Sequence, residues 1–301
     1  MKPINKNHFK SILIIAAATL SIILIAGLIV FFTGYRYITT DTAKFSGWVK
    51  KGQPVSGTIK YSNGDSGELS IDKNKKLTIK YSTGDVYEGG LKGVLRHGYG
   101  KITYKDGNVY EGDFINDVRT GNAKITYADG SSYIGAVIDG IPHGNGLYTF
   151  ADGSYYNGNF NMGKKDGIGE YRFSDGSYYY GTFVNDIKHG SEIVTVPLSD
   201  GTQYTGECTL HMANGDSYTG DYENDLPSGF GIFEWASGER YTGSFTAGMF
   251  NGQGTYTYAD GTSITETFVN GNLPKKPEVT EPDEQEQNTE SLENAGQQDE
   301  Q

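Results

Sequence analysis

Cysteine is almost absent from this chain: Cys208 is the only one in 301 residues. An internal disulfide and a cysteine-ligated zinc site are therefore both excluded. A lone thiol in a strand usually serves as a small packing group, and we expect this role for Cys208.

The chain also has few basic residues relative to its acids, with 25 Lys and Arg against 37 Asp and Glu and a formal net charge of −12. Nucleic acid and anionic lipid both attract basic surfaces. The excess of acidic over basic residues therefore argues against nucleic acid as a partner and disfavours binding to lipid headgroups. The local cluster of Lys73, Lys75 and Lys76 is expected to be a solvated turn.

Catalytic motifs are missing as well. Residues 158–164 have the G-x4-G-K spacing of a phosphate loop, but Lys165 replaces the required Ser or Thr and no helix is expected to follow. His97, His143 and His189 stand at equivalent positions before a repeated glycine, so we expect turn residues too far apart to share a metal. We predict no catalytic residue, no metal site and no cofactor.

Glycine and tyrosine are abundant, with 43 and 23 residues, and they form a repeat. The phrase Asp/Asn-Gly-x-x-Tyr-x-Gly-x-Phe returns every 23 residues, except between Tyr179 and Tyr218. A fixed period in this range indicates a repeat array. The aromatic residues expected in its core are Tyr87, Tyr110, Phe114, Tyr133, Tyr156, Phe160, Tyr179, Phe183, Tyr218, Tyr222, Tyr241 and Phe245. The glycines expected in its turns are Gly84, Gly107, Gly130, Gly153, Gly176, Gly201, Gly215, Gly238 and Gly261.

Each repeat is expected to form a β-hairpin around its Asp-Gly pair, such as Asp106 and Gly107. A two-residue loop would place Tyr104 and Tyr110 on opposite faces, because side chains alternate along a strand. A three-residue loop closed by Gly107 in the left-handed region pairs Ile102 with Tyr110 and puts the aromatic rings on one face. We favour the three-residue loop, since a half-solvated antiparallel sheet needs one apolar face.

The repeated tyrosine, the glycines in phase with it and the Asp-Gly turns resemble MORN (membrane occupation and recognition nexus) repeats over about two thirds of the chain. The resemblance implies β-hairpins stacked edge to edge in an elongated, single-layer antiparallel sheet, an all-β fold. It implies less about function, because such arrays occur both as membrane-associated scaffolds and as appendages of unrelated enzymes. No kinase catalytic segment is present here.

Residues 12–32 are apolar and uncharged, which is long enough for a helix to cross a hydrocarbon core of ~30 Å. A cleaved secretory signal is the alternative, but its apolar region is shorter, about 7–15 residues, and no cleavage site follows residue 32. Lys2, Lys6 and Lys10 precede the segment without any acid, so residues 1–11 are expected in the cytoplasm. The sequence thus predicts a single-pass protein of the cell membrane with an extracytoplasmic array.

The rest of the chain divides by composition. Residues 33–44 are expected to be a linker, and 45–82 a degenerate terminal cap of the array at 83–271. Within 190–217 the repeat phrase comes late and Pro197 interrupts a strand, so we expect a shortened unit with a bend or bulge. Residues 272–301 hold nine acids and two lysines, and are expected to be a disordered acidic tail.

These features favour a membrane-anchored, non-catalytic scaffold for protein–protein interaction at the cell surface. The alternative is a protein that binds a cell-wall or surface glycan through exposed tyrosine rings, with avidity from several weak sites. Phospholipid-headgroup binding and hydrolase activity are less favoured. Open sheet ends could also add strands from a second copy, which would give a homo-oligomer.

Overall fold

The computed structural model describes residues 34–190, 193–198 and 203–275. The predicted cytoplasmic segment at 1–11, the predicted membrane helix at 12–32 and residues 276–301 of the predicted tail lie outside the described residues. Within the described part of the chain, no helix is long and apolar enough to cross a bilayer.

The described residues form 23 strands. The first eight are β1 (Tyr35–Thr39), β2 (Ala43–Lys50), β3 (Gln53–Tyr61), β4 (Ser66–Ile71), β5 (Leu77–Tyr81), β6 (Val86–Lys92), β7 (Leu95–Thr103) and β8 (Val109–Ile115). The next eight are β9 (Val118–Thr126), β10 (Ser132–Ile138), β11 (Ile141–Thr149), β12 (Tyr155–Asn161), β13 (Lys164–Arg172), β14 (Tyr178–Val184), β15 (Ile187–Lys188) and β16 (Val194–Pro197). The last seven are β17 (Gln203–Gly206), β18 (Thr209–His211), β19 (Ser217–Glu223), β20 (Leu226–Glu234), β21 (Arg240–Thr246), β22 (Met249–Thr257) and β23 (Ser263–Phe268).

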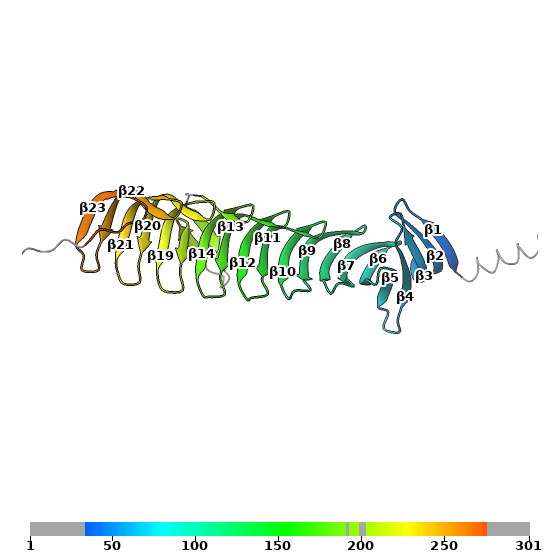
Figure 1. Cartoon of the computed structure of the whole chain (residues 1–301). Helices are drawn as coiled ribbons and strands as arrows, with labels where there is room; N and C mark the ends of the chain where they lie inside the picture. Colours follow the sequence, from blue (N-terminus) through cyan, green and yellow to red (C-terminus); the bar gives the residue numbers. More distant parts are fainter. Residues whose placement is uncertain (1–33, 191–192, 199–202, 276–301) are drawn as a thin grey trace, which may run out of the picture.

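Consecutive strands pair antiparallel, from β1 with β2 to β13 with β14 and again from β18 with β19 to β22 with β23. β14 also pairs with both β15 and β18, which joins the two series into one sheet of 21 strands. The sheet is a single open layer drawn out into a rod (Figure 1). The prediction of an elongated antiparallel sheet is confirmed. β1 lies within residues 33–44 and β2 begins at Ala43, so the segment expected to be a linker instead contains the first strand of the sheet and the start of the second.

The Asp-Gly turns have the expected three-residue loop. Gly107 donates its backbone N–H to the oxygen of Tyr104 at 3.0 Å, and Ile102 pairs with Tyr110. The loop requires a positive φ at its glycine, which is 95° at Gly107. Among the other glycines predicted for turns, Gly84, Gly130, Gly153, Gly176, Gly215, Gly238 and Gly261 also have positive φ, and Gly201 lies outside the described residues.

A second series of turns, which the sequence did not predict, lines the opposite edge. Asn116 and Asp117 connect β8 to β9 with φ of 50° and 73°, the type I′ geometry that matches the twist of a hairpin. We call these the tight turns. Each tight turn also binds the preceding repeat: Asp117 donates its backbone N–H to the oxygen of Arg96 at 2.9 Å. Successive repeats are therefore joined at this edge by more than strand pairing.

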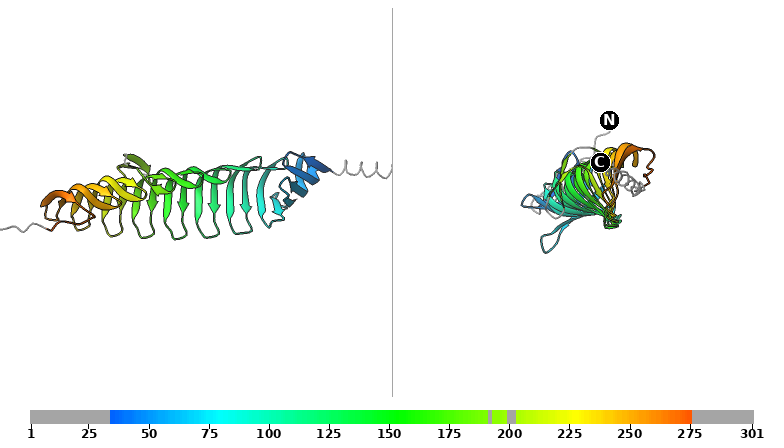
Figure 2. Two further views of the ribbon diagram at one scale, coloured as in Figure 1. Left: turned by 45° about the horizontal axis from the view of Figure 1, so that its top comes forward. Right: turned by 90° about the vertical axis from the view of Figure 1, so that its left-hand side faces the viewer.

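The strands are curved, so the sheet forms a long open trough (Figures 1 and 2). Tyr133 on β10 donates its hydroxyl to the backbone oxygen of Ala136, three residues along the same strand, at 2.7 Å. Side chains stand away from the plane of a flat strand, so this bond requires the strand to curl around the ring. The tyrosine face is therefore the inner face of the trough. The same bond joins Tyr87 to Gly90, Tyr110 to Asp113, Tyr156 to Asn159, Tyr179 to Thr182, Tyr218 to Asp221 and Tyr241 to Ser244.

Paired glycines leave the space that each tyrosine ring fills. The ring of Tyr133 lies over Gly135 on its own strand and over Gly146, which pairs with Gly135 on β11. A Cβ at either glycine would overlap the outer atoms of the ring. All twelve aromatic residues predicted for the core are at most 5% exposed. The fixed spacing between tyrosine and glycine in the sequence therefore reflects one packing contact, the ring over the paired glycines, that is repeated along the rod.

Between Tyr179 and Tyr218 the chain completes a repeat with an insertion in it, which corrects the expectation of a shortened unit. Gly190 bridges to Tyr222, and Thr209 pairs with Tyr180, as in an uninterrupted strand. β15 and β18 are therefore two halves of one strand, and residues 191–206 are inserted between them. The insert contains the separate hairpin β16–β17. The spacing of 39 residues between the two tyrosines equals one repeat plus this 16-residue insert.

Candidate functional site

The inner face of the trough carries two rows of aromatic rings. The first row is the buried core, whose rings meet edge to face across repeats. Tyr156, for example, has its centroid 5.1 Å from that of Phe160 and 5.0 Å from that of Phe183. Such contacts stabilise a core by about 0.5–1.5 kcal/mol each beyond the burial of area. This row is at most 5% exposed and so offers little surface to a ligand.

The second row lies toward the Asp-Gly turns, and its rings are only half-buried. They stack in tilted pairs such as Tyr127 with Tyr148, at 5.8 Å between centroids, and Phe150 with Tyr171, at 5.7 Å. The row comprises Tyr61, Tyr81, Tyr104, Tyr127, Tyr148, Phe150, Tyr171, Phe173, Phe233 and Trp235. Because these rings keep part of their surface in solvent, they offer apolar contacts to a molecule lying in the trough.

Basic side chains enter the trough near the tight turns, nine residues after four of the repeated tyrosines. Each charged group lies within about 6 Å of the centroid of an aromatic ring, a distance at which a cation is attracted to the ring. These residues are Arg96, Arg119, Lys165 and Lys188. These residues were not predicted from the sequence, because the net charge of the array does not show which fixed repeat positions are basic.

Acids in the tight turn of the following repeat hold these basic residues in place. Asp117 accepts hydrogen bonds from the backbone N–H of Arg96 at 2.8 Å and from its Nε at 2.9 Å. Asp186 accepts from the backbone N–H of Lys165 at 2.9 Å. For Arg96 and Lys165, the basic residue followed by an acid 21 positions later is a sequence signal that could have identified this arrangement.

Lys165 differs from Arg96 in that its charged group is not held by a direct ion pair within the described part of the chain. Among the described residues, no ion pair within 4.0 Å holds its Nζ. The Nζ lies 4.8 Å from the centroid of Tyr171. Burial lowers the pKa of Lys165, and Asp186 opposes this shift. An ammonium group in these surroundings would gain from a carboxylate supplied by a ligand.

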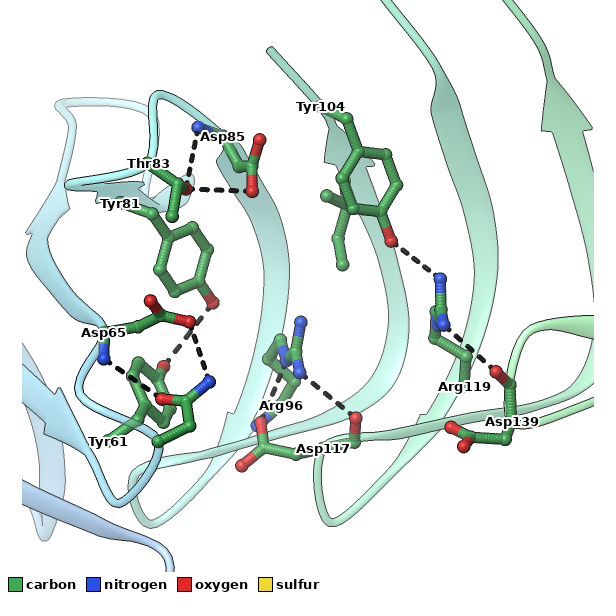
Figure 3. A pocket seen from close by; sticks show the side chains of 12 residues that line it. Tyr61, Asp65, Tyr81, Thr83, Asp85, Arg96, Tyr104, Asp117, Arg119 and Asp139 are labelled. Atoms are coloured by element: carbon green, nitrogen blue, oxygen red, sulfur yellow. Dashed lines mark hydrogen bonds and ion pairs between the residues drawn. The ribbon is translucent and has the colours of Figure 1, made fainter. Parts of the chain in front are cut away.

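The trough is hollowed near its N-terminal end, where Figure 3 shows a pocket of about 270 Å³. Tyr61 and Tyr81 point toward one another with their hydroxyl oxygens 3.4 Å apart. Arg119 donates to the hydroxyl of Tyr104 at 2.7 Å. Four carboxylates against two guanidinium groups give the lining a net negative charge; these residues are Asp65, Asp85, Asp117, Asp139, Arg96 and Arg119.

Three more pockets follow along the trough. The first, of about 320 Å³, is lined by Tyr104, Tyr127 and Arg119 among others. Tyr148, Phe150 and Lys165 contribute to the second, of about 340 Å³, and Tyr171, Phe173, Lys165 and Lys188 to the third, of about 210 Å³. Each pocket therefore combines half-buried rings with at least one basic group and one acid.

The insert lies against the outer face of the sheet. Leu198, directly after β16, packs on Tyr180, which is 7% exposed and also contacts Ile168. Beside them, Glu170 is fully buried and pairs with Arg172 at 2.6 Å. In the other repeats this face is mostly polar, as at the exposed pair of Lys101 and Glu111. The outer face is thus locally adapted to hold the inserted hairpin.

The cysteine, the histidines and the G-x4-G-K run all lie in or beside strands of the repeat. Cys208 is buried and occupies the place of a paired glycine, beside the ring of Tyr179. His97 and His143 lie within β7 and β11 and not in turns, which corrects that expectation. The described residues contain no group of three or more His, Cys, Asp or Glu that could hold a metal. The G-x4-G-K run spans β12, a tight turn and the start of β13, without a helix to receive a phosphate.

Comparison with known proteins agrees with this architecture. The MORN repeat family model matches seven segments that together make up half of the chain: residues 87–109, 110–132, 133–155, 156–178, 179–191, 218–240 and 241–263. No curated protein is significantly similar to the chain.

Solved structures matched by this chain include the TCP domain of SAS-4 (dCPAP) from Drosophila melanogaster, in complex with a proline-rich motif of Ana2 (dSTIL). The SAS-4 domain is 18% identical to this chain, the match covers 59% of this chain and 90% of the domain, and the TM-score is 0.29. The TCP10 domain of Danio rerio CPAP is 11% identical, the match covers 77% of this chain and 100% of the domain, and the TM-score is 0.31.

Proposed function

This chain belongs to the MORN repeat family, and we propose that it is a non-catalytic scaffold that binds an extended segment of a partner protein along the inner face of its trough. The observation that supports the proposal is the succession of four pockets in which rings, basic groups and acids recur. An enzyme concentrates its reactive groups at one point, whereas these groups are spread along the sheet. An extended chain is the ligand shape that can use them together.

The chemistry of the pockets specifies the partner segment further. Half-buried rings favour apolar side chains at intervals. The ammonium of Lys165, which has no carboxylate within 4.0 Å among the described residues, favours a carboxylate between them. The acidic lining near Tyr61 and Tyr81 favours a basic side chain at one end of the segment. Several modest contacts along the trough would then add up to useful affinity.

Selection of a displayed library of random linear peptides on the purified full-length chain tests this function. Selected peptides should lose affinity roughly tenfold when Lys165 is changed to Met or Tyr171 to Ala, because each change removes a central contact. Lys101→Met on the outer face is the matched control and should leave binding unchanged. Peptides that bind the trough variants as well as the natural chain would contradict the proposal.

A glycan ligand is the second candidate, favoured by the pocket of Figure 3. Tyr61, Tyr81 and Tyr104 line it together with carboxylates and guanidinium groups, and rings beside polar groups suit a sugar. Purified cell-wall polymer should then be retained by the natural chain and released by Tyr104→Ala. Retention that does not depend on this ring would remove the glycan hypothesis.

We further propose that residues 12–32 anchor the scaffold in the cell membrane with the array outside. The support is the apolar sequence and the basic residues before it. Protease added to intact cells should remove a tag placed after Gln301 while cytoplasmic markers survive. A tag that is cut only after lysis would place the array on the cytoplasmic side.

A further inference from the structure

Three aromatic side chains cluster on the outer face of the first hairpin, which is built from β1 and β2 at one end of the rod (Figure 1). Tyr35 on β1 lies directly opposite Trp48 on β2, so the two side chains share one face. The centroid of the Tyr35 ring is 5.5 Å from that of Tyr37 and 5.7 Å from that of Trp48. We call Tyr35, Tyr37 and Trp48 the aromatic patch.

The patch faces away from the core. Phe45 on β2 is buried in the core, so Trp48, three residues along the strand, points to the opposite face, because side chains alternate. Tyr37 is 78% exposed and Trp48 is 44% exposed. Such rings combine an apolar body with a polar tip, and they are most stable where apolar and aqueous surroundings meet.

The chain enters the sheet beside the patch. Val49 donates its backbone N–H to the oxygen of Gly34 at 2.8 Å, which holds Gly34 next to Trp48. The apolar run at 12–32 ends three residues before Tyr35, a length of chain that spans at most about 11 Å. The headgroup layer on each side of a hydrocarbon core is about 5–8 Å thick. A bilayer that holds residues 12–32 therefore brings its headgroups to the level of the patch.

The same end of the molecule is basic, although the whole chain is acidic. Residues 34–60 contain five basic residues and one acid, against a net charge of −12 for the chain. Lys44 and Lys60 pair directly across β2 and β3 on the outer face, and both are exposed. Among the described residues, no ion pair within 4.0 Å involves either lysine. Like charges directly opposite one another destabilise a sheet, so this pair would gain from an anion beside it.

A protein partner fits this surface less well than a bilayer. The three rings expose roughly 300 Å², taking a fully exposed aromatic residue as ~150–250 Å². This is less than half of the ~800 Å² that each partner contributes to a stable protein interface. A bilayer contact does not need such an area, because the anchor already keeps the patch at the membrane surface.

We propose that the aromatic patch, together with Lys44 and Lys60, lies in the headgroup layer of the bilayer that holds residues 12–32. The rings lie between headgroups and acyl chains, and the lysines bind lipid phosphates, as aromatic and basic residues do at membrane interfaces. The inference rests on the anchor in the proposed function and adds a second contact to it. With its outer face on the bilayer, the first hairpin has its inner face turned away from the lipid.

Tryptophan fluorescence tests the contact, because the chain has two tryptophans. Trp235→Phe leaves Trp48 as the single emitter, and Trp48→Phe leaves Trp235 in the trough as the matched control. Each full-length variant is reconstituted into vesicles of equal parts phosphatidylcholine and phosphatidylglycerol, brominated at the headgroup end of the acyl chains. Bromine quenches an indole ring that it touches. Trp48 should lose at least about half of its emission relative to unbrominated vesicles, and Trp235 almost none.

Charge reversal tests the lysines. Lys44→Glu with Lys60→Glu, in the chain that keeps only Trp48, places two acids against lipid phosphates and should lower the quenching at least about twofold. Lys101→Glu with Lys124→Glu, on the outer face of the repeats, is the matched control and should leave the quenching unchanged. Equal quenching in the two double variants would overturn the assignment of Lys44 and Lys60 to lipid.

Flotation of the vesicles separates this inference from the anchor on which it rests. A chain that floats with the vesicles after a high-salt wash, but whose Trp48 is not quenched, overturns the inference and leaves the anchor standing. If Trp48 in those vesicles is also protected from aqueous iodide, a second copy of the chain covers the patch, which overturns the inference equally. A chain that does not float overturns the anchor and this inference with it.

Discussion

The ring of Tyr133 lies against the backbone of Gly146 on the adjacent strand, and a methyl group on this glycine would overlap the ring. The ring cannot move aside easily, because its hydroxyl is bonded to Ala136. Gly146→Ala should therefore destabilise the array by about 1–3 kcal/mol, as overpacking of a core does. Urea denaturation measures the loss. Ala123 is the natural alanine at the equivalent position over Tyr110, so Ala123→Gly should change stability by less than about 1 kcal/mol. Equal effects of the two changes would contradict this account.

Asp117 stabilises the junction between two repeats through its carboxylate. It accepts two hydrogen bonds from Arg96 and also adopts a positive φ in the tight turn. Asp117→Ala removes the acceptor and a residue type that tolerates this φ, so it should lower stability by about 1–2 kcal/mol. Asp117→Asn keeps an acceptor oxygen and the turn preference, and should lower stability by less. The melting temperatures of the two variants measure this difference. An asparagine variant as unstable as the alanine variant would argue against a stabilising role of the hydrogen bonds between Asp117 and Arg96.

The core tyrosines should make the protein sensitive to alkali. Burial raises the pKa of Tyr110 and of Tyr133 to about 12, from an ordinary value near 10. Their folded pKa lies above the unfolded one, so this contribution to stability is complete below about pH 10 and is lost as pH rises through 12. We expect cooperative unfolding in this window, followed by circular dichroism, with tyrosinate absorbance rising in the same step. Tyrosinate formation well before unfolding would show that these hydroxyls are accessible.

The insert should be removable without loss of the array. Deletion of residues 191–206 joins Gly190 to Glu207 and restores the 23-residue period. β15 and β18 then become one continuous strand, as in the other repeats. Stability should change by no more than a few kcal/mol, mainly because Tyr180 loses its contact with Leu198. Circular dichroism and thermal melting test this, and failure of the deleted chain to fold would mean that the hairpin is part of the core.

The sequence was sufficient to predict the sheet and the register of its Asp-Gly hairpins, since one face had to collect Ile102, Tyr110 and their equivalents. The tight turns escaped prediction because they share a positive φ and not a residue type: Asn116 stands where Met162 stands in another repeat. The insertion was misread because a Gly-x-x-Tyr-x-Gly phrase within it imitates a repeat. The pockets could not be predicted from one repeat alone, because each is assembled from several.

One position in each repeat gives the trough a direction. The residue nine places after the repeated tyrosine is in turn Arg96, Arg119, Pro142, Lys165, Lys188, Pro227 and Phe250. If all seven were alike, a bound chain could slip by one repeat with little change in energy. The order from arginine to lysine to phenylalanine is different when read backwards. A partner segment would therefore dock in a single orientation and at a single offset, even though the sheet beneath it is periodic.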